Sequence, residues 1–164
     1  MSEQVFKKAE NMLQNICGKQ VSYVGRSCEL VEISFKDAAE MDPHKVNDEY
    51  VFHLQCPFRV FKSGKIIVGS DDLAYSASGD DFVDLDKRNS CVFDERCDLL
   101  DKEFMSEYVK AVKLNRIGDI HIELTSVMID IFVAMSTEDE SWRFFKLNPD
   151  SEHLVFENGC FDFA

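Results

Sequence analysis

Two arginines each follow an aromatic residue at the start of a strand-like segment: Arg59 follows Phe58, and Arg143 follows Trp142. A guanidinium group can hold a carboxylate or a phosphate through two parallel hydrogen bonds. His53 lies a few residues before the first pair. We therefore predict that Arg59, Arg143 and His53 bind a ligand. The alternative is that each arginine pairs with an acidic residue across the sheet or between the halves of the chain, which the many acidic residues favour.

Histidine, cysteine and acidic side chains are also the usual ligands of transition metals. His121 and Glu123 are two residues apart in a strand-like segment, so their side chains share one face. His53 and Cys56 lie on opposite faces unless Pro57 bends the chain. A transition-metal site needs three or four ligands, and the sequence assembles only two at a time, so we predict no metal site. The chain also lacks GxSxG, GxGxxG, HExxH and P-loop patterns, so we predict no catalytic residue and no cofactor.

Acidic residues are concentrated in two segments. The 164 residues include 31 Asp and Glu against 18 Lys and Arg, a net charge of −13. Residues 71–101 contain ten acidic residues against three basic ones, and residues 136–164 contain seven against two. Asp80, Asp81, Asp84 and Asp86 lie together in the first segment, and we predict that they bind a basic protein partner. The alternatives are that the charge only keeps the protein soluble, or that it binds calcium, although the EF-hand spacing is absent.

The composition also narrows the partners and the location. A charge of −13 argues against nucleic acid as a partner, because phosphate binding depends on clustered Lys and Arg. The start of the chain lacks the features of a secretory signal, and the longest apolar stretches have only strand length. We predict a cytoplasmic protein without a membrane partner, and the oligomeric state stays open. We expect the six cysteines to be free thiols, several of them in the core: Cys17, Cys28, Cys56, Cys91, Cys97 and Cys160.

The elements that position these residues form two similar series. In the first half, hydrophobic periodicity predicts a helix at residues 3–17 and strands at 21–23, 29–35, 50–55, 58–62 and 65–70. The turn between the first two strands is predicted at residues 25–27. In the second half, we predict a helix at residues 93–106 and strands at 108–117, 120–125, 128–135, 142–147 and 153–157.

This order predicts an α+β fold built by internal duplication of a helix plus an antiparallel β-meander. The two halves are expected to share a core about a pseudo-twofold axis, because neither meander can bury its apolar face alone. We predict a single domain over residues 1–164, with repeat unit one at about 3–72, an acidic connector at about 73–92 and repeat unit two at about 93–164. The alternative is two unrelated α+β stretches, and the sequence leaves open whether the strands form one sheet or two.

Three segments carry a resemblance to a known family: residues 53–59 (HLQCPFR), 68–72 (VGSDD) and 140–144 (ESWRF). They resemble a family of small uncharacterised bacterial proteins that have an HLQCPWR-like motif, a strand ending in VGS plus an Asp, and a closing WR strand. Phe58 stands where that motif more often has Trp. The resemblance implies a bacterial origin and the duplicated strand arrangement, and it implies no activity.

Two functions from different classes are consistent with these observations. The first is a non-enzymatic binding module whose acidic face docks a basic protein, as immunity proteins and antitoxins do. The second is a small-molecule binder or an enzyme with Arg59, Arg143 and His53 in a cleft between the halves. A purely structural or oligomerising protein is a third, which predicts a large exposed apolar patch.

Overall fold

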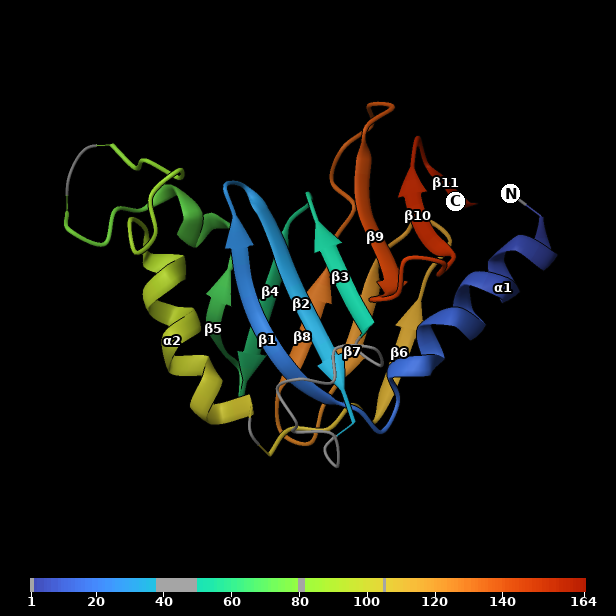
Figure 1. Ribbon diagram of the computed structural model, residues 1–164, viewed down its shortest axis with the longest axis horizontal. Helices are drawn as coiled ribbons and strands as arrows, with labels where there is room; N and C mark the ends of the chain where they lie inside the picture. Colours follow the sequence, from blue (N-terminus) through green and yellow to red (C-terminus); the bar gives the residue numbers. More distant parts are fainter. Residues whose placement is uncertain (1, 38–49, 80–81, 105) are drawn as a thin grey trace.

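The computed structural model of the chain describes residues 2–37, 50–79, 82–104 and 106–164. Its described part contains two helices and two antiparallel sheets stacked face to face, with a helix at each end of the stack (Figure 1). The fold class is therefore α+β, as the hydrophobic periodicity predicted. The question left open by the sequence is also answered, because the strands form two sheets.

The larger sheet has six strands in the order β1-β2-β3-β9-β10-β11. They are β1 (Gln20–Ser27), β2 (Leu30–Lys36), β3 (Tyr50–Leu54), β9 (Glu140–Lys146), β10 (His153–Glu157) and β11 (Cys160–Phe163). The smaller sheet has five strands in the order β5-β4-β8-β7-β6. They are β4 (Phe58–Lys62), β5 (Lys65–Gly69), β6 (Ala111–Leu114), β7 (Ile120–Glu123) and β8 (Met128–Ile131).

The two helices cover the open ends of the stack. Helix α1 (Glu3–Leu13) begins at Ser2, whose side chain accepts a hydrogen bond from the Val5 amide, and it packs beside β6 and β11. It ends earlier than the predicted residue 17, because a 3₁₀ turn (Gln14–Ile16) follows it. Helix α2 (Val92–Phe104) packs beside β1 and β5 at the other end (Figure 1). Within residues 2–37, 50–79, 82–104 and 106–164, no α-helix covers the outer face of either sheet.

The core between the sheets is rich in aromatic rings. Trp142 is fully buried, stacks on Phe156 at a centroid distance of 5.8 Å and meets the edge of Phe52. Its indole Nε1–H donates to the carbonyl oxygen of Gly118 at 2.8 Å, so the one polar atom of this side chain is satisfied inside the core. Trp142, which precedes Arg143 in the sequence, is therefore a central residue of the core.

Both sheets contain strands from both halves of the chain. In the larger sheet β3 pairs with β9, and in the smaller sheet β4 pairs with β8. The buried side chains of all these strands belong to one hydrophobic cluster. Each half therefore depends on the other for its core.

Two predictions about hairpins were wrong. The first turn was expected at residues 25–27, but Gly25 lies inside β1 and the turn is at Cys28–Glu29. The ring of Tyr23 lies so close to Gly25 that a Cβ atom there would sit 2.0 Å from the Tyr23 hydroxyl oxygen, so the glycine serves side-chain packing and not a turn. The prediction also missed β11, which follows Asn158 and Gly159 at φ +48° and +67°, the dipeptide typical of a tight hairpin.

Candidate functional site

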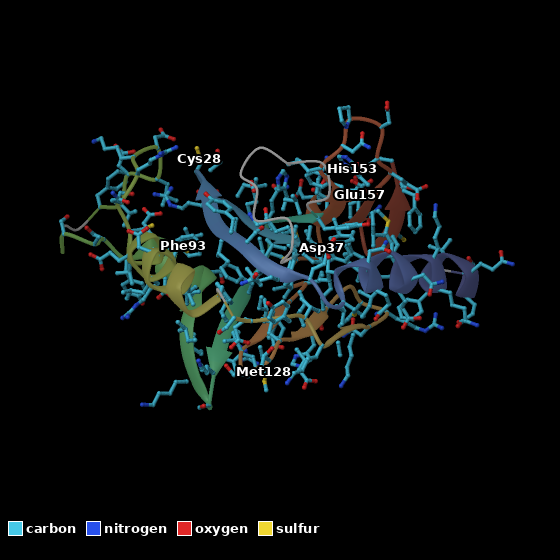
Figure 2. The ribbon with its side chains drawn as sticks, turned by 60° about the horizontal axis from the view of Figure 1, so that its bottom comes forward. Cys28, Asp37, Phe93, Met128, His153 and Glu157 are labelled. Carbon is cyan, nitrogen blue, oxygen red and sulfur yellow. The ribbon has the colours of Figure 1, made fainter. Side chains whose placement is uncertain are left out.

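Three polar groupings lie on the outside of the fold. One is on the outer face of the larger sheet and comprises Glu32, His53 and Arg143, here called the β9 ladder. The second is on the outer face of the smaller sheet and comprises Lys113, His121, Asp130 and Arg59, here called the β8 ladder. The third is a groove at the α2 end, here called the end groove. Figure 2 shows the two outer faces, with His153 on the side of the larger sheet and Met128 on the side of the smaller one.

The structure places His53 and Arg143 side by side on the larger sheet. They are direct cross-strand partners between β3 and β9, and Glu32 is the partner of His53 on β2. The Arg143 guanidinium is already occupied, since it donates to both carboxylate oxygens of Glu140 at 2.7 and 2.5 Å. A ligand at this face would therefore have to compete with a two-point ion pair.

Two imidazole rings enclose Phe145 beside Arg143. The centroid of Phe145 lies 5.0 Å from that of His53 and 4.4 Å from that of His153, and the second pair is stacked. Burial and the charge of Arg143 lower the pKa of His53 and of His153 below the ordinary value. Both rings are therefore neutral near pH 7. This cluster contributes packing between rings and not a charged binding site.

Arg59 lies on the other sheet and does not join His53 and Arg143 in one cleft. Its Nε and NH2 groups donate to one oxygen of Asp130 at 2.9 and 2.7 Å, and its guanidinium packs near the rings of Phe61 and Phe132. Asp130 belongs to the second half of the chain, so the alternative interpretation of this arginine, an ion pair between the halves, is the one observed. The ligand site predicted from three residues is divided between two opposite faces.

The β8 ladder runs across four strands of the smaller sheet. Lys113 on β6 is paired with His121 on β7, His121 with Asp130 on β8, and Asp130 with Arg59 on β4. His121 Nδ1 lies 2.6 Å from the Asp130 carboxylate oxygen that Arg59 leaves free. A hollow of about 200 Å³ lies beside the ladder. The sequence predicts that His121 and Glu123 share one strand face, but the side chain that contacts the His121 ring is Asp130.

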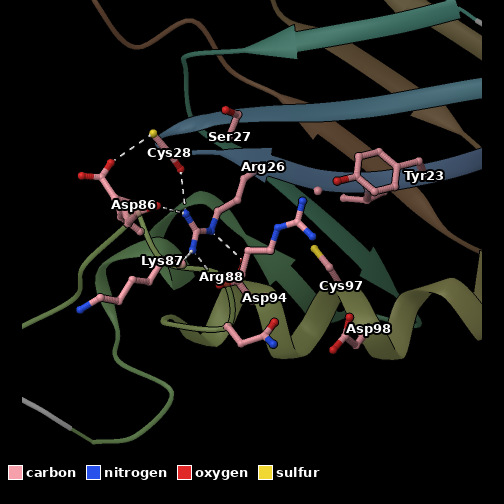
Figure 3. Close-up of a pocket in the computed structure, with 14 residues that line it drawn as sticks. Tyr23, Arg26, Ser27, Cys28, Asp86, Lys87, Arg88, Asp94, Cys97 and Asp98 are labelled. Atoms are coloured by element: carbon pink, nitrogen blue, oxygen red, sulfur yellow. Dashed lines mark hydrogen bonds and ion pairs between the residues drawn. The ribbon is translucent and has the colours of Figure 1, made fainter.

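The end groove lies between the β1–β2 hairpin, residues 85–89 and α2, and its volume is about 650 Å³ (Figure 3). Arg26 forms its base. The guanidinium donates to Asp94 through Nε and NH2, both at 2.7 Å, and to the carbonyl oxygens of Cys28, Leu85 and Lys87. With only 5% of its side chain exposed and its donors occupied, Arg26 holds three segments together and is not available to a ligand.

Sequence reasoning missed Arg26, and the reason is local. The residue follows Gly25, so it was counted with the predicted turn, whereas it lies inside β1. Its partner Asp94 lies in the first turn of α2. The Asp94 side chain also accepts hydrogen bonds from the amides of Ser90 and Cys91, which fixes the start of the helix. Burial alone would raise the pKa of Asp94, but the hydrogen bonds from Arg26 and Cys91 outweigh it and keep that pKa below the ordinary value.

The structure describes two of the four aspartates that were predicted to bind a partner. Asp80 and Asp81 lie outside the described residues. Asp84 pairs with Lys87 at 2.9 Å, and this contact lowers the pKa of Asp84. Asp86 is exposed and accepts a hydrogen bond from the Cys28 thiol. The two acidic segments do not merge, because the connector lies at the α2 end and strands β10 and β11 lie at the α1 end (Figure 1).

The cysteines lie as expected for thiols that mostly pack. Cys56, Cys91 and Cys97 are buried, while Cys17, Cys28 and Cys160 are exposed, and all six are free. Burial raises the pKa of the Cys56 thiol to about 12, so this group stays protonated and unreactive. Within the described parts of the chain, no three or more His, Cys, Asp or Glu side chains are grouped as metal ligands would be.

Comparisons with protein-family models, with curated proteins and with solved structures found no match for the chain. No helix among the described residues is long and apolar enough to cross a membrane. The resemblance to the bacterial family and the cytoplasmic location stay predictions, and the function has to be inferred from the geometry.

Proposed function

We propose that the protein is a non-enzymatic binding module that docks a basic protein through its α2 end. The observation that carries this proposal is the combination of exposed acidic and exposed large apolar side chains on the elements of that end. Asp86, Glu95 and Asp98 are exposed there. So are Tyr75, Phe82 and Leu99, with 64, 79 and 57% of their surface accessible. Apolar anchors surrounded by charge are typical of protein interfaces, where the anchors give affinity and the charges give a fast association rate.

The anchoring by Arg26 supports this proposal. An acidic segment that only confers solubility can be mobile, whereas residues 85–90 are attached to the hairpin and to α2 through the hydrogen bonds of one buried guanidinium. A surface that is ordered before binding loses less conformational entropy when the partner docks. We therefore infer that the buried Arg26 orders this exposed acidic segment for a specific contact with the partner.

Charge reversal at the two ends of the molecule tests the proposal. The bait is the full chain in native lysate, at about 50 mM and about 300 mM salt. We expect a basic protein to be retained at low salt and released at high salt. Glu95→Lys with Asp98→Lys should abolish its retention, because both residues are exposed on α2.

The matched control is Asp150→Lys with Asp162→Lys, which makes the same charge change at exposed positions of the opposite end. Retention that falls equally in both double variants would mean that net charge alone attracts the partner, and it would overturn the proposal. So would retention that is insensitive to salt.

We also infer that the chain arose by duplication of a helix and an antiparallel meander. The strand order supports this inference. Strands β1, β2 and β3 continue into β9 and β10 in one sheet, and β6, β7 and β8 continue into β4 and β5 in the other. Exchanging the halves therefore exchanges the strands of the two sheets except β11, and we expect it to bring Arg59 on β4 to the position of Arg143 on β9. An experimental structure in which the halves superpose with these two arginines coincident is the expected result, and a shifted register would contradict the inference.

A further inference from the structure

Both ladders combine a histidine, an acidic residue and an arginine, but only the β8 ladder has groups left for a ligand. In the β9 ladder, Glu140 occupies the guanidinium of Arg143, and Phe145 lies between the rings of His53 and His153. In the β8 ladder, the arginine and the aspartate serve to hold the histidine. The β9 ladder is therefore a packed cluster, whereas the β8 ladder keeps polar groups that are available to a ligand.

Asp130 fixes the orientation of His121. An ionised carboxylate only accepts hydrogen bonds, so the contact of 2.6 Å requires that Nδ1 of His121 carries the proton and donates it. Arg59 donates twice to the other oxygen of Asp130, which holds this carboxylate in place. The second ring nitrogen, Nε2, is then left for a ligand on an imidazole that is about one third exposed.

Lys113 supplies a positive charge next to this ring. It is exposed, it is the cross-strand partner of His121, and its ammonium group forms no ion pair with any residue that the structure describes. The neighbouring carboxylates are engaged, since Asp119 accepts from Asn115 and from the Val133 amide, while Asp130 is held by Arg59 and His121. Among the described residues, the group left without an ion pair at this point of a chain of charge −13 is therefore a cation, the Lys113 ammonium.

The adjacent hollow adds an apolar wall. Its volume is about 200 Å³, and on the ladder face it is bordered by the ring of Phe132, by Lys113 and His121, and by the carboxylates of Asp119 and Asp130. This is below the usual volume of about 300–1,000 Å³ for a drug-sized ligand. At about 30 Å³ for a water-sized group, the hollow accommodates roughly six or seven heavy atoms.

We propose that the β8 ladder binds the carboxylate of a small organic acid with a short apolar chain. The carboxylate oxygens accept hydrogen bonds from Lys113 Nζ and from Nε2–H of the imidazolium form of His121, and the chain lies against Phe132. Asp130 and the bound carboxylate then face the imidazolium from two sides, Lys113 and Arg59 lie along the ladder, and Glu123 is the next residue on the same face of β7. Arg59 acts as a positioning residue through Asp130. This proposal does not depend on the α2 end.

Four probes separate the chemistry that the site recognises: butyrate, butylamine, butanol and inorganic phosphate. The measurement is a titration of the full chain followed by NMR, using the side-chain ¹³Cε1 signal of His121 and the backbone amides of β6 and β7. We expect butyrate to give a saturable shift with a dissociation constant of about 1–10 mM. Butanol and butylamine share its apolar chain without the anion, and phosphate is an anion without the chain, so each should bind at least about tenfold more weakly.

Variants on the two ladders provide the matched comparison. Lys113→Met and His121→Asn should each weaken butyrate binding about tenfold or more, whereas His53→Asn and Arg143→Met in the β9 ladder should leave it unchanged. Lys113 is exposed, so Lys113→Met tests the site even if His121→Asn does not fold. Equal shifts with butanol, equal shifts with phosphate, or an equal loss in the β9-ladder variants would each overturn the proposal.

Discussion

Arg26 on β1, Arg59 on β4 and Arg143 on β9 have different roles, and burial decides which role each one has. Arg26 has 5% of its side chain exposed, against 45% for Arg59 and 37% for Arg143. A buried guanidinium must satisfy its donors within the protein, so it orders the backbone around it. An exposed one gains little from a single ion pair and remains available for orienting other groups.

The first prediction compares Arg26 with Arg143. Arg26→Met leaves Asp94 as a buried charge without its partner and leaves the carbonyl groups of Leu85 and Lys87 without a donor. We expect it to lower the free energy of unfolding by about 3–5 kcal/mol, measured by urea denaturation. Arg143→Met removes a partly exposed pair and should cost about 1 kcal/mol or less. Equal costs for the two variants would show that Arg26 does not hold the connector.

The same pair links stability to pH at low pH. The pKa of Asp94 is below its ordinary value in the folded chain, so its contribution is complete above the unfolded pKa of about 4. That contribution is lost as the pH falls through the lower folded value. The variant Asp94→Asn should be less stable at neutral pH and should show a flatter decline of stability below about pH 4.

The second prediction concerns the two histidines that enclose Phe145. Their pKa values are lowered in the folded state by burial and by Arg143, so the unfolded chain binds more protons below the ordinary value of about 6.5. Stability should therefore fall as the pH decreases from about 6.5, until the folded-state values are passed. His53→Gln with His153→Gln should flatten this decline, as measured by urea midpoints between about pH 7 and about pH 5. A decline of unchanged slope in the double variant would show that other groups cause it.

At the scale of elements, two glycines in hairpin turns share a backbone conformation but differ in their surroundings. Gly118 has φ +88° in the β6–β7 turn, and a Cβ atom there would lie 2.6 Å from the ring of Phe156. Gly64, in the β4–β5 turn, has φ +76° but open space around it. Both glycines have a positive φ, and only Gly118 also leaves space for the core ring of Phe156.

The third prediction uses this contrast. Gly64→Ala should cost about 1–2 kcal/mol, because its only penalty is the left-handed conformation of an alanine. Gly118→Ala should cost about 1–3 kcal/mol more, since Phe156 must move and the core is already filled. Trp142 donates to the Gly118 carbonyl and is the only tryptophan, so its fluorescence should change in Gly118→Ala and not in Gly64→Ala. Equal stability and equal spectra for both variants would contradict the clash.

The elements themselves were largely readable from the sequence, and the exceptions have physical causes. Strands with clear alternation, such as β3 and β4, were predicted within a residue or two of their observed bounds. The first turn was misplaced because Gly25 was taken as a turn residue, whereas the Tyr23 ring is what requires a glycine there. Strand β11 was missed although Asn158 and Gly159 gave its signal. Arg59 and Arg143 were found through their aromatic neighbours, but their separation onto two faces depends on sheet pairing, which no local pattern determines.

At the scale of the whole molecule, the two sheets couple the halves of the chain. The β3–β9 and β4–β8 pairs are both contacts between residues far apart in the sequence. Phe52 of the first half lies 4.6 Å from Phe144 of the second, measured between ring centroids, and its edge meets Trp142. The α2 end and the β8 ladder therefore belong to one cooperative unit, although they are separate surfaces.

The last prediction tests this coupling by dividing the chain in its connector. Residues 1–79 alone would leave one face of Phe52 without its partners and would expose the edges of β3 and β4, and residues 82–164 alone would leave Trp142 and the edges of β8 and β9 unpaired. We expect each fragment by itself to lack near-ultraviolet circular dichroism, and an equimolar mixture to recover the spectrum of the intact chain. Trp142 should move from a solvent-exposed to a buried emission on mixing, which reports the core directly. A fragment that is cooperatively folded alone would show that one half can complete its own core, because the cross-half strand pairs would then not be required.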